Sequence, residues 1–261
     1  MHAVEPGVFL VGETRIIEEG LAAYLEYSGV SGWRSDAPTD AERLIEAYGR
    51  LCYRSFQPGL NPNITKIREH NKEYLANILS SKHGSVLEHP VLNFIFADVS
   101  RVFTHELVRH RVGVAISQES LRFVRLDDLG QWLPTVIRED EQAVAIFART
   151  FEELERLQRE LAEHFKLDAP GTPFRKKKTT TSAMRRIAPI GLATTIGWSA
   201  NIRTVRWVLE MRTDPSAEEE MRLVFGKVGE VVTSRYPHLF GNFTVEMVDG
   251  LPWYKPEHSK V

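Results

Sequence analysis

The residues best suited to chemistry lie in one short stretch, in which Arg109-His110-Arg111 is followed by Ser120 and Arg122. Successive helical residues point about 100° apart, so the three basic side chains fan out and can reach different acceptors where a helix ends. A helix C-terminus favours cations because its unpaired carbonyl groups carry partial negative charge. Arginine binds phosphate through paired hydrogen bonds and stacks on flat rings. The stretch therefore suits an anionic ligand with planar parts, such as a nucleotide; the alternative is a helix end whose charges are solvated.

Two predicted elements would position this stretch. A helix capped by Ser100 is expected to end near Val108, directly before the basic triplet. A strand is expected over Leu121–Val124. Because residues two apart in a strand project from the same face, Ser120 and Arg122 would present a hydroxyl and a guanidinium side by side.

The stretch resembles the signature of the flavin-dependent thymidylate synthases. That signature is Arg-His-Arg, a spacer of seven or eight residues, Ser, and Arg two positions later; here Val112–Glu119 is the longer, eight-residue spacer. Three further segments fit the family in the same order. They are His83, Ser85, Glu88 and His89 before a strand, Arg185 four residues before Pro189, and Asn201-Ile202-Arg203 followed by Arg212-Thr213-Asp214.

The resemblance implies the fold and the reaction. It implies one domain over residues 1–261, with the matched core at about 83–214, and an α+β fold in which long helices flank a mixed sheet. Its FAD site is not of the Rossmann type, and no Gly-rich strand-turn-helix is visible in the sequence. The implied reaction is the reductive methylation of dUMP to dTMP, in which FAD carries electrons from NADPH and methylenetetrahydrofolate supplies the carbon. A cytoplasmic homotetramer with shared active sites is also implied.

The resemblance also assigns roles to individual residues. Arg212, which would stabilise negative charge on the uracil ring, and Ser120 are the candidate catalytic residues. A nucleophilic role for Ser120 lacks a general base at an obvious position beside it. The residues expected to bind dUMP are Glu106, Arg109, Gln118, Glu119, Ser120, Arg122, Arg185 and Arg212. The residues expected to bind FAD are His83, Ser85, Arg109, His110, Arg111, Gln118, Asn201, Arg203 and Trp207.

One position departs from the family pattern. Trp207 stands where an Asn or His usually contacts the flavin cofactor. Trp207 follows Arg203 by four residues, so both lie on one helix face, and the indole ring would stack on the adenine instead of donating through an amide.

Composition narrows the classes of function. A net charge of −2 gives no electrostatic argument for binding nucleic acid or a membrane surface. No apolar run approaches the roughly 20 residues needed to cross a bilayer, and no secretory signal is evident. The single cysteine, Cys52, permits no intrachain disulfide, fits a reducing cytosol and is expected to be a buried core thiol. Because His83, His89, His105 and His110 include no helical i, i+4 pair, no metal site is expected.

The remaining pattern predicts the supporting elements. Thr39 begins a capping-box pattern for a helix that reaches about Ser55. Asn201 and Arg212 are eleven apart, so they would share one face of a helix that opens at Trp198. Ser216 would cap a last long helix, and the tail from Val245 would pack loosely. The other expected elements are strands at 7–12 and 91–96 and helices at 16–27, 64–81, 143–165 and 218–235.

Two alternatives to the thymidylate synthase reaction stay open from the sequence. A related flavin-dependent enzyme could transfer a one-carbon group to another pyrimidine nucleotide, a reading that Trp207 leaves room for. A non-enzymatic nucleotide-binding protein would be colourless when purified, and its binding to nucleic acid would depend steeply on salt.

Overall fold

The computed structural model describes residues 2–261, and the chain groups into two compact units. The first unit comprises the chain up to Phe9, Ile95–His110 and Ile116–Trp198. The second unit comprises Leu10–Phe94, Arg111–Ala115 and Ser199–Val261. The candidate residues are therefore distributed over both units, and each unit is described by itself.

The main sheet has four strands in the order β2-β3-β6-β4. In β3, the alternate residues Leu92, Phe94 and Phe96 are fully buried, as the two-residue period of a strand requires when one face is covered. The predicted strands at 7–12 and 91–96 are confirmed, and the second is longer than predicted. The strands are β2 (Gly7–Glu13), β3 (Val91–Ser100), β4 (Val114–Gln118) and β6 (Ala193–Asn201).

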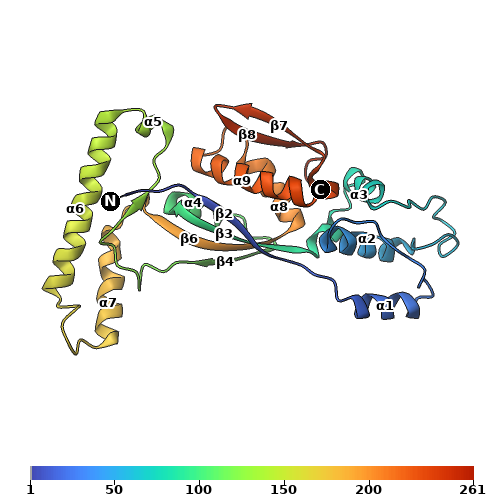
Figure 1. The fold of residues 1–261 in the computed structure, drawn as a ribbon, viewed down its shortest axis with the longest axis horizontal. Helices are drawn as coiled ribbons and strands as arrows, with labels where there is room; N and C mark the ends of the chain where they lie inside the picture. Colours follow the sequence, from blue (N-terminus) through green and yellow to red (C-terminus); the bar gives the residue numbers. More distant parts are fainter. Residues whose placement is uncertain (1) are drawn as a thin grey trace. The chain divides into compact units, whose positions relative to one another are not determined.

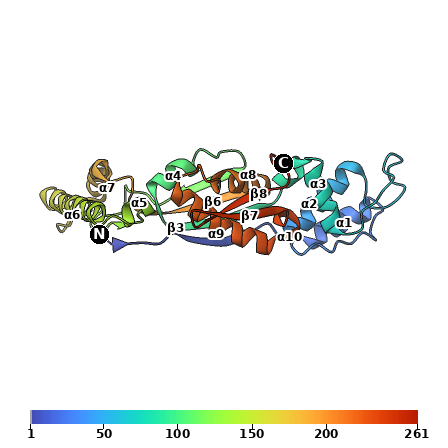
Figure 2. The ribbon, with the colours of Figure 1, turned by 90° about the horizontal axis from the view of Figure 1, so that it is seen from above.

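In the first unit, β3 runs directly into the predicted helix α4 (Arg101–Leu107), whose first turn is capped by the hydroxyl of Ser100 accepting from the amide of Phe103 at 3.0 Å. A short parallel pair joins β1 and β5. The long helix α6 was predicted, whereas α7 was not, and Figures 1 and 2 show the two side by side. The remaining elements are β1 (His2–Ala3), β5 (Gly130–Gln131), α5 (Thr135–Arg138), α6 (Glu141–His164), α7 (Phe174–Met184) and the 3₁₀ turn η2 (Arg185–Ile187).

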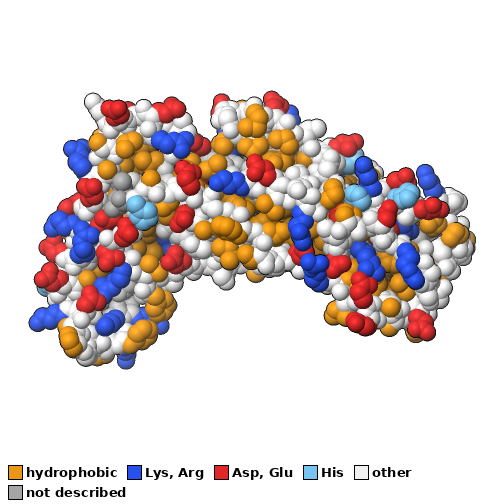
Figure 3. Space-filling model, viewed as in Figure 1, with side chains coloured by type: hydrophobic (Ala, Val, Ile, Leu, Met, Phe, Trp, Pro, Cys, Tyr) orange, Lys and Arg blue, Asp and Glu red, His pale blue; other side chains and the backbone are white. Residues whose placement is uncertain are grey.

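Helix α6 packs along one side only. Its buried residues include Phe151, Gln158 and Ala162, spaced so that they fall on one helical stripe. Figure 3 shows acidic and basic side chains interspersed over this helix. The predicted helix at 143–165 is therefore confirmed, although Ile146 and Phe147 near its start are exposed.

The second unit is mainly helical. Its elements are α1 (Glu18–Tyr27), α2 (Asp40–Tyr53), α3 (Asn71–Ser80), the 3₁₀ turn η1 (Gly84–Glu88), α8 (Ile202–Arg212), α9 (Glu219–Arg235), α10 (Pro237–Phe240), β7 (Phe243–Val248) and β8 (Leu251–Pro256). The capping-box prediction for α2 is confirmed, because the Thr39 hydroxyl accepts from the amide of Glu42 and donates to its carboxylate. Leu25, Trp33 and Phe56 belong to a core cluster that joins α1 to the segments on either side of α2.

Two predicted helix starts and one predicted helix cap are wrong. Helix α3 begins at Asn71 instead of Ile64, because the Asp36 carboxylate accepts from the Asn71 amide at 2.7 Å and fixes the helix start there. Trp198 does not open a helix, because it is a fully buried residue of β6. Helix α9 is capped by the Glu218 carboxylate, while the Ser216 hydroxyl is engaged by Asp214.

The C-terminal part is also more ordered than predicted. Residues from Phe243 to Pro256 form an antiparallel hairpin, β7–β8, that packs on α9 and leaves Tyr254 only 3% exposed. A Cβ atom at Gly229 would lie 2.3 Å from the Tyr254 ring, so the absence of a side chain there allows the close approach. Figures 1 and 2 show the hairpin lying along α9.

The prediction that Cys52 is a buried core thiol is wrong. Its thiol is free and exposed, so it is not a core residue as the flanking Leu51 and Tyr53 suggested. Those two neighbours are exposed as well. The buried face of α2 lies about half a helical turn away from Cys52 and carries the polar residues Glu42, Glu46 and Arg50.

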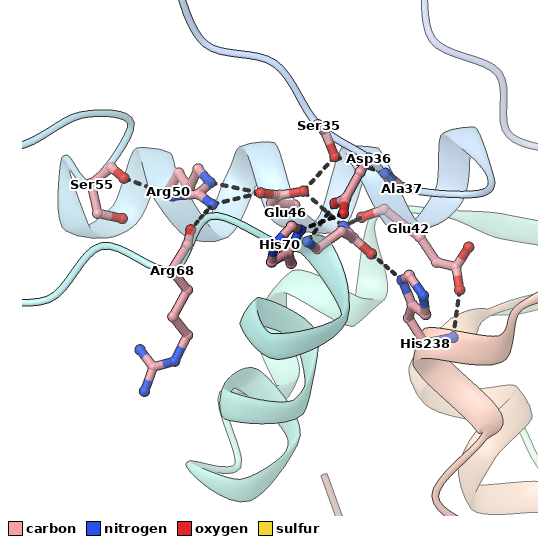
Figure 4. Close-up of polar contacts among 11 residues, drawn as sticks. Ser35, Asp36, Ala37, Glu42, Glu46, Arg50, Ser55, Arg68, His70 and His238 are labelled. Atoms are coloured by element: carbon pink, nitrogen blue, oxygen red, sulfur yellow. Dashed lines mark hydrogen bonds and ion pairs between the residues drawn. The ribbon is translucent and has the colours of Figure 1, made fainter.

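A buried polar network connects α2, α3 and α10 (Figure 4). The fully buried carboxylate of Glu46 forms an ion pair with Arg50 at 2.7 Å and accepts from the Asn71 amide group at 2.7 Å. Asn71 Oδ1 also lies 2.7 Å from the ring nitrogen Nδ1 of His238, whose backbone amide donates to Glu42. Burial raises the pKa of Glu42 and lowers that of His238. Each buried charge thus has partners, which is the condition for burial at tolerable cost.

No helix of the described residues combines the length and the apolar character that crossing a bilayer requires.

We predict that Asn71→Ala lowers the free energy of unfolding by about 2–3 kcal/mol, because it removes one donor to the buried Glu46 carboxylate and the hydrogen-bond partner of the His238 ring. Urea unfolding at neutral pH measures this change. Asn77→Ala on the same helix is the matched control, since Asn77 is only half-buried and lies outside the network. Equal losses in the two variants would contradict the structural role of Asn71.

A second prediction concerns pH. Arg235 and Tyr236 donate to the Glu13 carboxylate and hold its pKa at about 2, below the ordinary 4.5. Because the folded pKa is depressed, this stabilisation is complete above pH 4.5 and is lost as the pH falls toward 2. Glu13→Gln should therefore cost about 2 kcal/mol at pH 7, with a gap to wild type that narrows below pH 4.5. A gap of constant size from pH 7 to pH 3 would disprove this linkage.

Candidate functional site

In the first unit, the segment after β4 is a turn, so the predicted strand over Leu121–Val124 is wrong. The ladder between β4 and β6 ends where the Glu119 amide donates to the Thr195 carbonyl at 2.9 Å. The next amides then turn back to Ser120: Phe123 donates to the Ser120 carbonyl and Arg122 to the Ser120 hydroxyl, at 3.0 and 3.3 Å. Ser120 and Arg122 therefore do not share a strand face, and Arg122 is exposed, with its guanidinium 6.0 Å from the Phe123 ring.

This turn forms one wall of a cavity of about 490 Å³. The cavity brings together four residues that the sequence assigned to dUMP binding, namely Gln118, Glu119, Ser120 and Arg185. It is completed by residues that were not predicted as site residues: Arg101, Leu121 and Arg186. Three guanidinium groups, a hydroxyl and an amide line this open cavity together with the single Glu119 carboxylate, so cationic donors outnumber the acidic group and suit an anion.

Hydrogen bonds fix the walls of this first cavity. Arg101 Nη2 donates to the Glu119 carbonyl at 3.1 Å, and Gln118 Nε2 donates to the Thr104 hydroxyl at 3.1 Å. Burial, and secondarily the nearby Arg185 charge, lower the pKa of Arg101, although Glu119 acts in the opposite direction. An anion bound in this cavity would favour the charged form of Arg101.

The Arg-His-Arg triplet follows the end of α4 as predicted. Arg109 and Arg111 are exposed, whereas His110 is buried, so the three side chains do fan out. Glu106 is half-buried in the last turn of α4. Arg111 belongs to the second unit together with Val112 and Gly113.

The second unit contains a separate cavity of about 320 Å³ at the start of α8. Of the residues expected to bind FAD, it brings together Asn201, Arg203 and Trp207. Arg203 and Trp207 lie one turn apart on α8, as their spacing predicted. The other lining residues are Glu88, Val112, Thr204, Lys260 and Val261, of which the last two lie at the C-terminal end of the sequence and carried no motif.

Asn201 has a different role from the one predicted from helix geometry. It is the last residue of β6 and the N-cap of α8, and its side-chain oxygen accepts from the Thr204 amide at 2.9 Å. Asn201 therefore does not share a helix face with Arg212, which is the half-buried last residue of α8. The capping geometry leaves the Asn201 Nδ2 group beside Gly113, at the second cavity.

The loop that carries Gly113 is held against the start of α8. The Asn201 amide donates to the Gly113 carbonyl at 3.1 Å, and the Thr204 hydroxyl donates to the Val112 carbonyl at 2.7 Å. Gly113 has φ of +67°, and a Cβ atom there would lie 2.2 Å from Asn201 Nδ2. Only glycine accommodates both the backbone conformation and the close contact.

The His83–His89 segment forms the 3₁₀ turn η1 with its flanking residues. Ser85 is exposed, and no side-chain hydrogen bond caps η1. The ring of His83 packs edge-on against Tyr53, with centroids 5.4 Å apart, and His89 stacks on Tyr48 at 3.9 Å. Among residues 2–261 there is no cluster of three or more His, Cys, Asp or Glu side chains arranged to hold a metal ion.

The second cavity has the chemistry to hold part of a dinucleotide such as FAD. Trp207 offers a flat ring that is 40% exposed, and Arg203 and Lys260 supply cations for phosphate. Asn201 adds an amide donor whose position is fixed by the cap. In the first cavity, the three arginines and Ser120 instead match a nucleotide monophosphate.

Comparison with known proteins identifies the family to which the chain belongs. Residues 35–238 match the family model described as thymidylate synthase complementing protein. A flavin-dependent thymidylate synthase of Corynebacterium efficiens is 34% identical over 221 residues, which cover 84% of this chain and 86% of the relative. The chain belongs to the flavin-dependent thymidylate synthase family. A second relative with this description, from Corynebacterium glutamicum, is 35% identical over 222 residues, with coverage of 84% and 86%.

Solved structures confirm the α+β fold. Thymidylate synthase X from Helicobacter pylori, with FAD and dUMP, matches with a TM-score of 0.59 at 19% identity, covering 90% of this chain and 97% of that one. The UMP/dUMP methylase PolB from Streptomyces cacaoi, bound with 5-Br UMP, matches with a TM-score of 0.61 at 14% identity, covering 92% and 94%.

We predict that Gly113→Ala disrupts the start of α8. A new Cβ atom would displace the Asn201 side chain and strain the backbone, at a cost of about 3 kcal/mol in the free energy of unfolding. Gly29→Ala is the control, because Gly29 has a similar φ of +69° but no atom within 4 Å of the added Cβ. Chemical unfolding of both variants separates the clash from the backbone strain, and similar losses would show that the Asn201 contact contributes nothing.

Proposed function

We propose that the chain catalyses the reductive methylation of dUMP to dTMP, with FAD as cofactor, NADPH as reductant and methylenetetrahydrofolate as carbon donor. The observation that carries this proposal is the first cavity, which Arg101, Arg185 and Arg186 line together with Ser120. Membership of the flavin-dependent thymidylate synthase family supplies the reaction class.

In this proposal the nucleotide phosphate binds in the first cavity. The arginines neutralise its charge through paired hydrogen bonds, and Ser120 donates to a phosphate oxygen. Gln118, held by Thr104, orients the nucleotide through its amide oxygen. Glu106, Arg109, Glu119 and Arg122 complete the proposed dUMP-binding set.

The cofactor-binding set is proposed to comprise His83, Ser85, Arg109, His110, Arg111, Gln118, Asn201, Arg203 and Trp207. When bound and reduced by NADPH, FAD would supply a hydride for the pyrimidine, and these residues would hold and orient it. Trp207 stacks on a ring of the cofactor, and Arg203 binds phosphate.

Arg212 is proposed to stabilise the negative charge that develops on the uracil ring, an electrostatic role that requires a fixed cation. No protein nucleophile is needed in this scheme, and Cys52, exposed on α2, lines neither cavity. The homotetramer and the cytoplasmic location stay predictions from the family resemblance.

The test is anaerobic reduction of the purified protein with NADPH, followed by flavin absorption. We expect a yellow protein that bleaches faster when dUMP is present and that forms dTMP when methylenetetrahydrofolate is added. Arg185→Ala should raise the dUMP concentration for half-maximal bleaching by about 30-fold, as expected for loss of a charge-assisted phosphate contact.

Arg175→Ala is the matched control, because Arg175 is an exposed arginine of α7 that does not line the cavity. A colourless protein that takes up no FAD would refute the enzyme proposal. Faster bleaching with UMP or dCMP than with dUMP would instead favour the related pyrimidine nucleotide methyltransferase.

A further inference from the structure

The C-terminal segment, residues 257–261, forms part of the second cavity although no motif marked it. Lys260 and Val261 line the cavity together with Glu88, Arg203 and Trp207. The segment follows the β7–β8 hairpin directly, so the hairpin determines where it begins. The chemistry of these residues extends the cofactor site beyond the residues that the family motifs identify.

Charge within the cavity depends on one lysine. Arg203 Nη1 donates to the Glu88 carboxylate at 2.5 Å, so Glu88 offsets the Arg203 charge. Lys260 is the further cation among the lining residues, and no acidic side chain besides Glu88 lines the cavity. Among the side chains that line this cavity, Lys260 is therefore the cation that has no acidic side-chain partner in the lining.

The backbone of Lys260 is held from both sides. Before it, the Ser259 hydroxyl donates to the Glu210 carboxylate on α8. After it, the main-chain oxygen of Val261 accepts from Arg203 Nε at 3.1 Å, and Val261 is only 6% exposed. A Cβ atom at Gly84 would lie 2.7 Å from the Val261 carbonyl carbon, so this end packs tightly against η1.

Lys260 itself has φ of +56°, in the left-handed region that residues other than glycine rarely adopt. Such a conformation costs free energy and persists only where neighbouring contacts impose it. Here the Ser259 and Val261 contacts impose it while the Lys260 side chain stays exposed at the cavity. These contacts therefore fix the backbone of Lys260 beside the cavity, where its side chain lies exposed.

We propose that Lys260 is a further cofactor-binding residue, which binds a phosphate group of the dinucleotide beside Arg203. This inference rests on the proposed function, because it assigns FAD to the second cavity. The lysine supplies the attraction for phosphate that the Glu88–Arg203 ion pair by itself does not provide, and the Val261 contact keeps the Arg203 guanidinium oriented.

The test is titration of apoprotein with FAD, followed by quenching of flavin fluorescence at low and high salt. Lys260→Ala should weaken binding about fivefold and reduce its salt dependence, whereas Lys260→Arg should bind nearly as wild type does. Lys255→Ala is the control, because Lys255 lies on β8, pairs with Glu246 and does not line the cavity. The exposed position of Lys260 predicts an unchanged thermal unfolding midpoint in both alanine variants.

Deletion of residues 259–261 should weaken FAD binding at least as much as Lys260→Ala does, since Arg203 also loses its contact with Val261. The inference would be overturned if Lys260→Ala bound FAD as tightly as the wild-type protein or more tightly, or if the deletion variant bound FAD more tightly than the wild type. Either result would leave the proposed function intact. Loss in Lys260→Arg as large as in Lys260→Ala would also overturn the inference, because the charge would then be irrelevant. A wild-type protein that binds no FAD would refute both the inference and the proposed function.

Discussion

Two strand ends that are also helix caps determine where the candidate site residues lie. Ser100 ends β3 and caps α4, and Asn201 ends β6 and caps α8, each by accepting from the amide three residues later. With no connecting loop, the first helical residues have no freedom to shift in register. Arg101 and Arg203 are therefore delivered to their cavities by the backbone itself. A flexible loop in either place would let these guanidinium groups adopt many positions, and ordering them on a ligand would then cost conformational entropy.

The sequence predicts those parts of this arrangement that depend on residues close together along the chain. The caps by Ser100 and Thr39 are predicted because a short polar side chain precedes a run with helical periodicity. The first cavity is partly predictable, because Gln118, Glu119 and Ser120 are adjacent along the chain and Arg185 has a recognisable spacing to Pro189. Arg101 and Arg186 were not predicted as site residues. Arg101 directly follows the predicted Ser100 cap, and Arg186 directly follows the predicted site residue Arg185.

The errors arise where distant contacts override local preference. Residues 121–124 have strand-like residue types. However, the hydroxyl and the carbonyl of Ser120 accept hydrogen bonds from the backbone amides of Arg122 and Phe123, and these bonds close a turn. Trp198 precedes a helix yet stays in the sheet, and the helix begins only after the Asn201 cap. Lys260 and Val261 have no local signature, since only the folded β7–β8 hairpin brings them to the second cavity.

The hairpin and helix α9 depend on each other for a simple reason. Gly226 and Gly229 lie in the middle of α9, where each glycine disfavours a helix by about 1 kcal/mol relative to alanine. Because these glycines have no side chains, Pro252 and Tyr254 of the hairpin pack directly against the helix backbone. Helix and hairpin should consequently form and melt as one cooperative unit, with amide protons that exchange at a common rate. The segment that ends at Val261 follows this hairpin directly, so the wall that it forms in the second cavity should open on the timescale of that unit.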